Sequence, residues 1–167
     1  MKRLFPLLAA SLLAACAAYS GHGLVPGSAE LDEVVRVMGE RAMRWREADG
    51  SVQLAYPRGP AGFHTFMARL SPDGKLQGIE NVLDAKGFAR IRPGMTEAEV
   101  LKTLGPPFPA WTSYFKARDE PVWQWRYCDA WNTAAHFSVL FDGSSRTVRT
   151  SMSISESCAL TYCSCSK

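Results

Sequence analysis

The sequence has little of what most enzymes use for catalysis. Its three histidines, His22, His64 and His136, stand in neither the His-x3-His nor the His-x-His spacing that favours a metal site. It contains no Gly-x-Ser-x-Gly nucleophile elbow. Residues 59–62 (Gly-Pro-Ala-Gly) lack the Gly-x4-Gly-Lys-Ser pattern of a phosphate-binding loop. Because no set of residues suggests a reaction, we expect a protein that is not an enzyme and that uses no cofactor and no metal.

The sequence also lacks a long hydrophobic run and an excess of charge of one sign. Residues 4–15 are uncharged, but these twelve residues fall short of the roughly 20 that span a bilayer as a helix. Without residues 1–15, which hold two of the 19 basic residues, 17 basic residues face 16 acidic ones. Proteins that bind nucleic acid present a basic face, so we expect no nucleic-acid partner. The 47% apolar content is typical of a folded globular protein.

The N-terminus has the features of an export signal. Lys2 and Arg3 precede the apolar run, and small residues end it, as in a secretory signal peptide. The last four residues, Leu-Ala-Ala-Cys at 13–16, resemble the bacterial lipobox, whose cysteine is acylated before cleavage on its N-terminal side. This resemblance implies a signal peptide at 1–15, a lipidated Cys16 and a tether at 16–24; the alternative is a plain signal with an incidental cysteine. Two or three acyl chains such as palmitate anchor a protein stably in a membrane.

The residue after the lipidated cysteine helps to decide whether a lipoprotein stays in the inner membrane or moves to the outer membrane. It is Ala17, whereas the signal for retention at the inner membrane is typically Asp. For a Gram-negative cell we therefore expect an outer-membrane protein that faces the periplasm.

Four further cysteines remain in the exported chain, Cys128, Cys158, Cys163 and Cys165. An even number in an oxidising compartment favours disulfides. A zinc or copper site is the alternative, since three thiols fall within eight residues, but the spacing is not that of paired zinc knuckles. Cys128 with Cys158 is the preferred pair, because both end predicted strands. Cys163 and Cys165 are then too close to pair without strain, so the assignment stays open.

A pattern occurs twice along the chain. Residues 33–39 with Trp45 match residues 99–105 with Trp111 at a constant offset of 66. Each copy predicts a helix that follows a Pro-Gly turn, with one apolar face and a terminal glycine. Ser28 and Thr96 are the expected N-caps, and Thr96 with Glu99 predicts a capping box.

About three strand-like runs follow each predicted helix, at residues 52–56, 63–70 and 75–83 and again at 122–128, 136–141 and 147–154. Short turns between them favour antiparallel hairpins. The sequence therefore predicts an α+β fold of two tandem modules, at residues 25–91 and 92–156, with a Cys-rich tail at 157–167.

The second copy carries a further resemblance. It reads Arg-Pro-Gly-Met-Thr-Glu-Ala-Glu-Val at 92–100 and Leu-Gly-Pro-Pro at 104–107, then Trp125-x-Tyr127 and Phe-x-Val-x-Phe-Asp at 137–142. These motifs are similar to those of the SmpA/OmlA (BamE) lipoprotein family, and the two copies look like a tandem version of it. The resemblance implies a sheet packed by helices, like that of β-lactamase-inhibitor proteins. The first copy departs from the pattern with Ser28-Ala29 in place of Met-Thr and Arg41 in place of Pro.

The resemblance implies an accessory scaffold lipoprotein that docks onto an envelope assembly for β-barrel insertion. The alternative is an inhibitor or ligand-binding lipoprotein that uses a concave sheet face.

Aromatic residues supply the candidate contacts for a protein partner. Alternation places Trp123, Trp125 and Tyr127 on one face of a strand, as core residues. Trp111, Tyr114 and Phe115 fall in the predicted loop after the second helix, where they would be exposed anchors for a partner. Gly94, Met95 and Thr96 form a second candidate contact, because Met at an exposed helix start is unusual.

Overall fold

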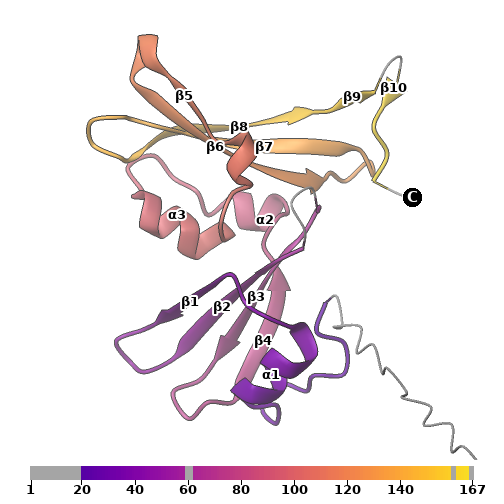
Figure 1. The fold of residues 1–167 in the computed structure, drawn as a ribbon. Coiled ribbons are helices and arrows are strands. Elements are labelled where there is room, and N and C mark those ends of the chain that lie inside the picture. Colours follow the sequence, from indigo (N-terminus) through magenta and orange to yellow (C-terminus); the bar gives the residue numbers. More distant parts are fainter. Residues whose placement is uncertain (1–19, 59–61, 159–160, 166–167) are drawn as a thin grey trace, which may run out of the picture.

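The computed structural model describes residues 20–58, 62–158 and 161–165, and within them the chain forms two four-stranded antiparallel sheets with few helices (Figure 1). The first half comprises α1 (Leu31–Met38), β1 (Met43–Arg46), β2 (Val52–Pro57), β3 (Thr65–Leu70) and β4 (Leu76–Asn81). The α+β class expected from the sequence is confirmed. The predicted signal peptide and Cys16 lie outside the described residues.

The second half begins with α2 (Ala85–Phe88), α3 (Glu97–Leu104) and the 3-10 turn η1 (Pro109–Trp111). Its sheet comprises β5 (Ser113–Phe115), β6 (Glu120–Cys128), β7 (Ala134–Phe141) and β8 (Val148–Ser155), with a second 3-10 turn, η2 (Lys116–Arg118), after β5. A small hairpin of β9 (Ser157–Cys158) and β10 (Thr161–Tyr162) follows. Each main sheet thus has four strands rather than the expected three. The extra strands, β1 and β5, span four and three residues, which is too short for alternation to predict them.

The same backbone contacts occur in both halves. The amide of Gly27 donates to the carbonyl of Leu76 at 2.7 Å, and the amide of Gly94 donates to that of Val148 at 2.8 Å. Each contact ties the turn before a helix to the start of the last strand of its sheet. In addition, β3 and β7 each carry a β-bulge near their C-terminal end. The two halves therefore share a hydrogen-bonding pattern as well as a sequence pattern.

The two helix starts differ. Thr96 caps α3 with the expected capping box, in which the Thr96 amide donates to Glu99 Oε2 at 2.7 Å. The N-cap of α1 is Glu30, whose side chain makes no capping bond, and Ser28 lies two residues upstream in a turn. The expectation for Ser28 is therefore wrong. At the constant offset of 66, Thr96 corresponds to Glu30 and not to Ser28, so the N-cap falls two residues later than expected.

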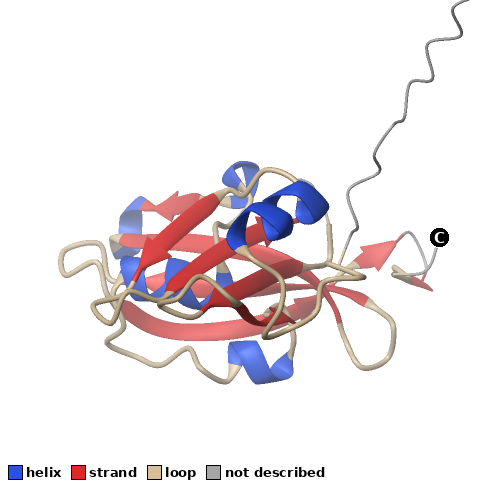
Figure 2. Ribbon diagram, turned by 90° about the horizontal axis from the view of Figure 1, so that it is seen from below, coloured by secondary structure: helices blue, strands red, loops and turns tan. Residues whose placement is uncertain are grey.

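The helices α2 and α3 lie between the two sheets, and α1 lies across the first sheet (Figures 1 and 2). One core cluster joins the first sheet, the helices α2 and α3, and the second sheet. Its members include Met67 of β3, Val100 and Leu104 of α3, and Trp125 and Phe137 of the second sheet. Trp123 and Tyr127 pack against the same cluster, so the alternation expected at residues 123–127 is confirmed. The other cluster packs α1 on the opposite face of the first sheet.

Polar contacts fix α3 to both sheets. The Trp125 indole N–H donates to the carbonyl of Gly105 at 3.2 Å, and Gln53 Nε2 donates to the carbonyl of Lys102 at 2.6 Å. Gly105 has a φ of +75°, and a Cβ there would lie 2.8 Å from Cγ2 of Thr65. Only glycine suits this position, because the conformation is left-handed and the first sheet packs directly on it.

The four cysteines form two disulfides, but not the preferred pair. Cys128 is bonded to Cys165, and Cys158 to Cys163. The chain reverses in the β9–β10 hairpin, which brings Cys163 back to Cys158, with 5.2 Å between their Cα atoms. Cys165 then reaches the β6–β7 turn, where its amide donates to the carbonyl of Asn132 at 3.0 Å. The expected Cys128–Cys158 pair is wrong because this reversal places Cys163 beside Cys158 and Cys165 beside Cys128.

No helix in the described part of the chain is long and apolar enough to cross a membrane. Nor do the described residues contain a group of three or more His, Cys, Asp or Glu side chains that could hold a metal ion.

Candidate binding site

The three aromatic candidates lie along one edge of the second sheet. Trp111 belongs to η1, and Tyr114 and Phe115 belong to β5. The sequence predicted a loop here; the structure has a 3-10 turn followed by a short strand. In the strand order β5-β6-β7-β8, β5 is the outermost strand, and all three of its residues are exposed.

The prolines after α3 direct the chain to this edge. Pro106 and Pro107 follow Gly105 directly, and proline cannot continue a helix because it lacks the amide donor and clashes with the preceding turn. The chain leaves α3 and meets β6, where the Phe108 amide donates to the carbonyl of Gln124 at 3.4 Å. As a result, η1 is held beside the part of β6 that β5 does not cover.

A half-open apolar pocket lies next to η1. Its volume is about 350 Å³, and its walls include Pro57, Thr65, Pro107, Phe108, Trp111 and Trp125. The Trp111 ring is half-buried and makes edge contacts with Phe108 and His136, each with 4.7 Å between ring centroids. Residues from both halves of the chain therefore form the walls of this pocket. We call it the junction pocket.

An ion-paired arginine lies at the margin of the junction pocket. Arg126 bonds to both carboxylate oxygens of Glu156, at 2.6 and 2.7 Å, and His136 Nε2 lies 2.8 Å from the same carboxylate. The Arg126 hydrogen bond lowers the pKa of Glu156, although burial opposes it. The guanidinium also lies over the Phe63 ring, 4.3 Å from its centroid. Arg126 is thus fixed in place at this margin, and Glu156 balances its charge.

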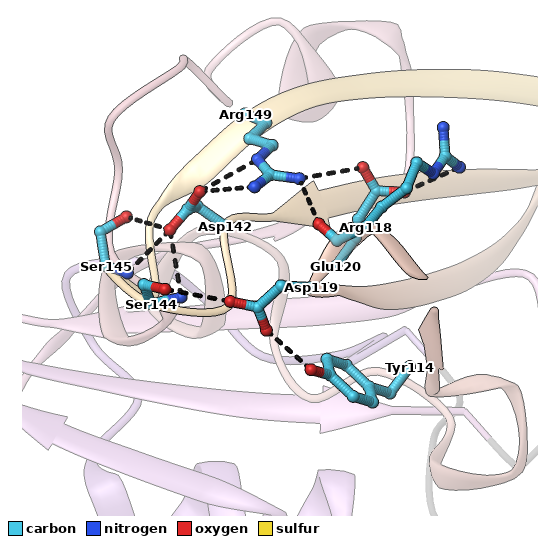
Figure 3. A network of polar contacts seen from close by, with 8 residues as sticks. All are labelled: Tyr114, Arg118, Asp119, Glu120, Asp142, Ser144, Ser145 and Arg149. Atoms are coloured by element: carbon cyan, nitrogen blue, oxygen red, sulfur yellow. Dashed lines mark hydrogen bonds and ion pairs between the residues drawn. The ribbon is translucent and has the colours of Figure 1, made fainter. Parts of the chain in front are cut away.

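Tyr114 and Phe115 are 57% and 50% exposed. The Tyr114 hydroxyl donates to Asp119 Oδ1 at 2.7 Å, and this bond raises the pKa of Tyr114 (Figure 3). Asp119 is itself fixed to the neighbouring turn, since Ser144 Oγ donates to its other carboxylate oxygen at 3.0 Å. The exposed tyrosine ring is therefore held in one position before any partner arrives.

The second candidate contact, at Gly94, Met95 and Thr96, lies before α3, and its methionine is less exposed than expected. Met95 is half-buried and packs against the shared core, while its sulfur accepts from the Arg92 amide at 3.1 Å. The amide of Val148 donates to the Met95 carbonyl at 2.8 Å, which ties this turn to β8. The premise of an exposed methionine does not hold, and the position of Gly94–Thr96 indicates a structural role.

Two features of the surface were missed by sequence reasoning. The wall that Pro57 and His64 contribute to the junction pocket comes from the β2–β3 hairpin, and nothing local in the sequence links that hairpin to η1. Trp131 is 88% exposed at the β6–β7 turn. The turn residues Asp129 and Asn132 around it are the signal that could have indicated this.

Comparisons with protein-family models, with curated proteins and with solved structures found no match for this chain.

Proposed function

We propose that this protein is a lipid-anchored lipoprotein of the bacterial envelope that acts as a non-catalytic scaffold or accessory binding protein. In this proposal it faces the periplasm from the outer membrane and serves outer-membrane protein assembly or envelope integrity. The observation that carries the proposal is the aromatic edge, in which Tyr114 and Phe115 are exposed on β5 and Trp111 lines an apolar pocket. Tyr and Trp are enriched among the residues that dominate binding energies at protein interfaces.

Contacts that recur in both halves support a duplication within the chain. Equivalent backbone contacts before α1 and α3, and equivalent bulges in β3 and β7, fit a tandem duplication of one helix-and-strands module. We infer that the modules at residues 25–91 and 92–156 are two copies of this module. The single sheet that the resemblance implied is not what the described residues form, because the two copies contribute separate sheets around α3.

Capture from native membranes tests the scaffold role. Tagged full-length protein should retain subunits of the barrel-assembly machinery, and Tyr114→Ala with Phe115→Ala should reduce their recovery at least tenfold. Both side chains are largely exposed, so their removal should leave stability within about 0.5 kcal/mol of the parent. Val25→Ala, which trims a side chain that is 60% exposed, is the matched control and should leave recovery unchanged. Equal recovery from all variants would contradict the role of this edge.

Membrane attachment is tested at Cys16. Cys16→Ser removes the thiol that would form the thioether to lipid, so the variant should leave the membrane fraction while its fold is retained. Fractionation after salt and alkaline washes measures the difference. If the serine variant still resists both washes in the membrane fraction, the lipoprotein proposal fails.

The junction pocket favours a second function, that of an inhibitor or ligand-binding lipoprotein. Its volume of about 350 Å³ lies at the lower end of the roughly 300–1,000 Å³ of small-molecule sites. Recovery of a single periplasmic enzyme in the same capture experiment, without barrel-assembly subunits, would favour this function over the scaffold.

A further inference from the structure

The last strand of the second sheet, β8, forms an edge that is longer and less charged than the other edges of the two main sheets. It spans eight residues, and positions 150–155 (Thr-Ser-Met-Ser-Ile-Ser) contain no charge, no proline and no glycine. Edge strands can pair with another chain, and proteins usually prevent this with short or charged edges. The other three edges follow this rule, because β1 carries Arg44 and Arg46, β4 carries Glu80, and β5 has three residues.

The ladder between β7 and β8 decides which backbone groups of β8 face outward. The Glu156 amide donates to the Ala134 carbonyl at 2.8 Å, across the two strands. Alternate residues of an antiparallel strand direct their N–H and C=O groups to the same side, so every second residue of β8 before Glu156 bonds to β7. The residues between them face away from the sheet, and these are Ser151, Ser153 and Ser155. No residue that the structure describes pairs with β8 on this outer side of the three serines.

The start of the same edge already pairs with an extended segment of this chain. The Val148 amide donates to the Met95 carbonyl, and the Val148 carbonyl accepts from the Gly94 amide, both at 2.8 Å. Thr96 and Thr147 add an antiparallel bridge. The edge is therefore able to accept an extended backbone, but this segment covers none of the positions from 150 to 155, which are exposed or half-buried.

The apolar side chains of β8 lie on one face of this edge. Ile154 lies opposite His136 of β7, and Met152 points to the same face because it is two positions away. The two side chains are 56% and 45% exposed. On that face His136 contacts the Trp111 ring, with 4.7 Å between ring centroids. An added strand with apolar residues on this face would therefore extend a surface that begins at η1.

The charges that flank positions 150–155 are already paired within the molecule. Arg149 donates to Asp142 through Nε and Nη2, at 3.1 and 2.6 Å (Figure 3). Arg126 donates to both carboxylate oxygens of Glu156, at 2.6 and 2.7 Å. Because these charges already have partners, the segment that suits the edge is itself uncharged, with apolar residues alternating with small polar ones.

The size of the open edge suits a peptide segment better than a second folded copy. Positions 150–155 match a strand of about six residues, or roughly 20 Å. Pairing over this length buries less than the roughly 1,200 Å² of a stable interface between folded proteins. Recognition of a peptide as an added strand does not need that area, because main-chain hydrogen bonds supply the affinity and alternate side chains the specificity.

We propose that the β8 edge binds an extended, uncharged segment of another polypeptide, which joins the second sheet as a further strand and places apolar side chains beside Met152 and Ile154. Strands of membrane β-barrels alternate apolar and polar residues in this way, and their backbone groups are unpaired before the barrel folds. The partner is an outer-membrane protein chain that has not yet folded, a choice that rests on the proposed function. β5 and β8 are the two opposite edges of the sheet, so both can be occupied at once.

Fluorescence anisotropy with a labelled peptide tests the binding. The peptide alternates valine and threonine and ends in lysines for solubility, and the protein is the full-length acylated chain in a nonionic detergent. Ser153→Pro should bind the peptide at least tenfold more weakly than the parent, because proline lacks the outward amide and leaves the ladder to β7 in place. Ser153→Ala keeps that amide and is the matched control, which should bind like the parent. Near-ultraviolet circular dichroism should show that both variants are folded.

A methylated peptide makes the test independent of any variant. The same peptide with methyl groups on its backbone nitrogens keeps every side chain but donates no hydrogen bond along the strand. It should bind the parent at least tenfold more weakly than the unmethylated peptide. Equal binding of the two peptides would mean that side chains alone make the contact, and this result would overturn strand addition.

Amide hydrogen exchange tests where the strand is added. In the free protein the amides of Ser151, Ser153 and Ser155 should exchange fast, whereas the ladder to β7 protects those of Met152 and Ile154. Bound peptide should slow the three serine amides. Slowing at the junction pocket instead would overturn the assignment to β8. Serine amides that become protected without peptide, as the protein concentration rises, would assign the edge to a second copy and overturn the proposal.

A competition experiment tests the class of partner. A porin unfolded in urea and diluted into the assay should displace the peptide from the parent. The same porin folded in detergent is the control and should not displace it, because its strands are already paired in a closed barrel. Displacement by neither form would overturn the assignment to unfolded outer-membrane proteins.

The results for the β8 edge are separable from those for the proposed function. A parent protein that does not bind the peptide overturns the β8 site and leaves the capture of barrel-assembly subunits through Tyr114 and Phe115 standing. Conversely, capture that the Tyr114 and Phe115 variants do not change overturns the aromatic edge, while peptide binding at β8 is unaffected.

Discussion

Asp142 fixes the turn that follows β7, and the pKa of its carboxyl group is strongly lowered. Its carboxylate accepts from the Ser145 amide at 2.8 Å and from Arg149 Nη2 at 2.6 Å (Figure 3). These contacts, the Ser145 backbone bond first, lower the pKa of Asp142 from 3.8 to about 2. Because the folded-state pKa lies below the unfolded one, the contribution is complete above pH 3.8 and is lost as the pH falls through about 2.

We therefore expect Asp142→Asn to remove part of the acid sensitivity of folding. The slope of the urea midpoint against pH should become shallower between pH 3.8 and about 2, and the carboxyl carbon of Asp142 in the parent should titrate near the lower value by NMR. Asp32→Asn, which removes a carboxylate from α1 and touches no part of this turn, is the control and should keep the Asp142 contribution. A carboxyl carbon that titrates at its ordinary value would contradict the hydrogen-bond assignment.

At the scale of elements, the two helix starts provide a matched comparison. Thr96→Ala removes the capping box of α3, in which Thr96 Oγ1 accepts from the Glu99 amide at 3.3 Å. We expect a loss of about 1 kcal/mol in the free energy of unfolding. Ser28→Ala removes the residue expected to cap α1, but Ser28 makes no cap there, so this substitution should cost less than about 0.5 kcal/mol. Urea unfolding measures both, and equal losses would contradict the assigned caps.

Elements whose signal is local could be predicted from the sequence. The capping box needs only Thr96 and Glu99, three residues apart, and the end of α3 needs only Gly105. Both could be placed before the structure was known. β5 could not, because its three residues pair with β6 only after Lys116–Arg118 reverses the chain.

Features that depend on distant contacts could not be predicted. The choice of Cys165 as the partner of Cys128 depends on the β9–β10 hairpin. The junction pocket needs Pro57 and Trp111 to meet, although they belong to different sheets. Of the candidate site, the three aromatic residues at the edge were identified from the sequence, but the pocket beside Trp111 and the exposed Trp131 were not.

At the scale of the whole molecule, one core cluster that includes residues of α3 joins the two halves. Met67 of β3 is 1% exposed and belongs to the same core cluster as Phe137 of β7. Met67→Ala should lower the free energy of unfolding by roughly 2–5 kcal/mol, because it leaves a cavity in that cluster. Since the cluster spans both sheets, the loss should not be confined to the half that carries the substitution.

Amide hydrogen exchange can separate one unit from two. In a single unit, the slowest-exchanging amides of β3 and β7 should lose the same protection in Met67→Ala, because both exchange through global unfolding. Met152→Ala trims a side chain that is 45% exposed on β8 and should change neither strand by more than about 0.5 kcal/mol. A loss confined to β3 would mean that the halves unfold separately. The junction pocket, whose walls come from both halves, would then open whenever the less stable half unfolds. Equal losses in both strands would instead mean that the pocket persists as long as the fold does, as a preformed binding site requires.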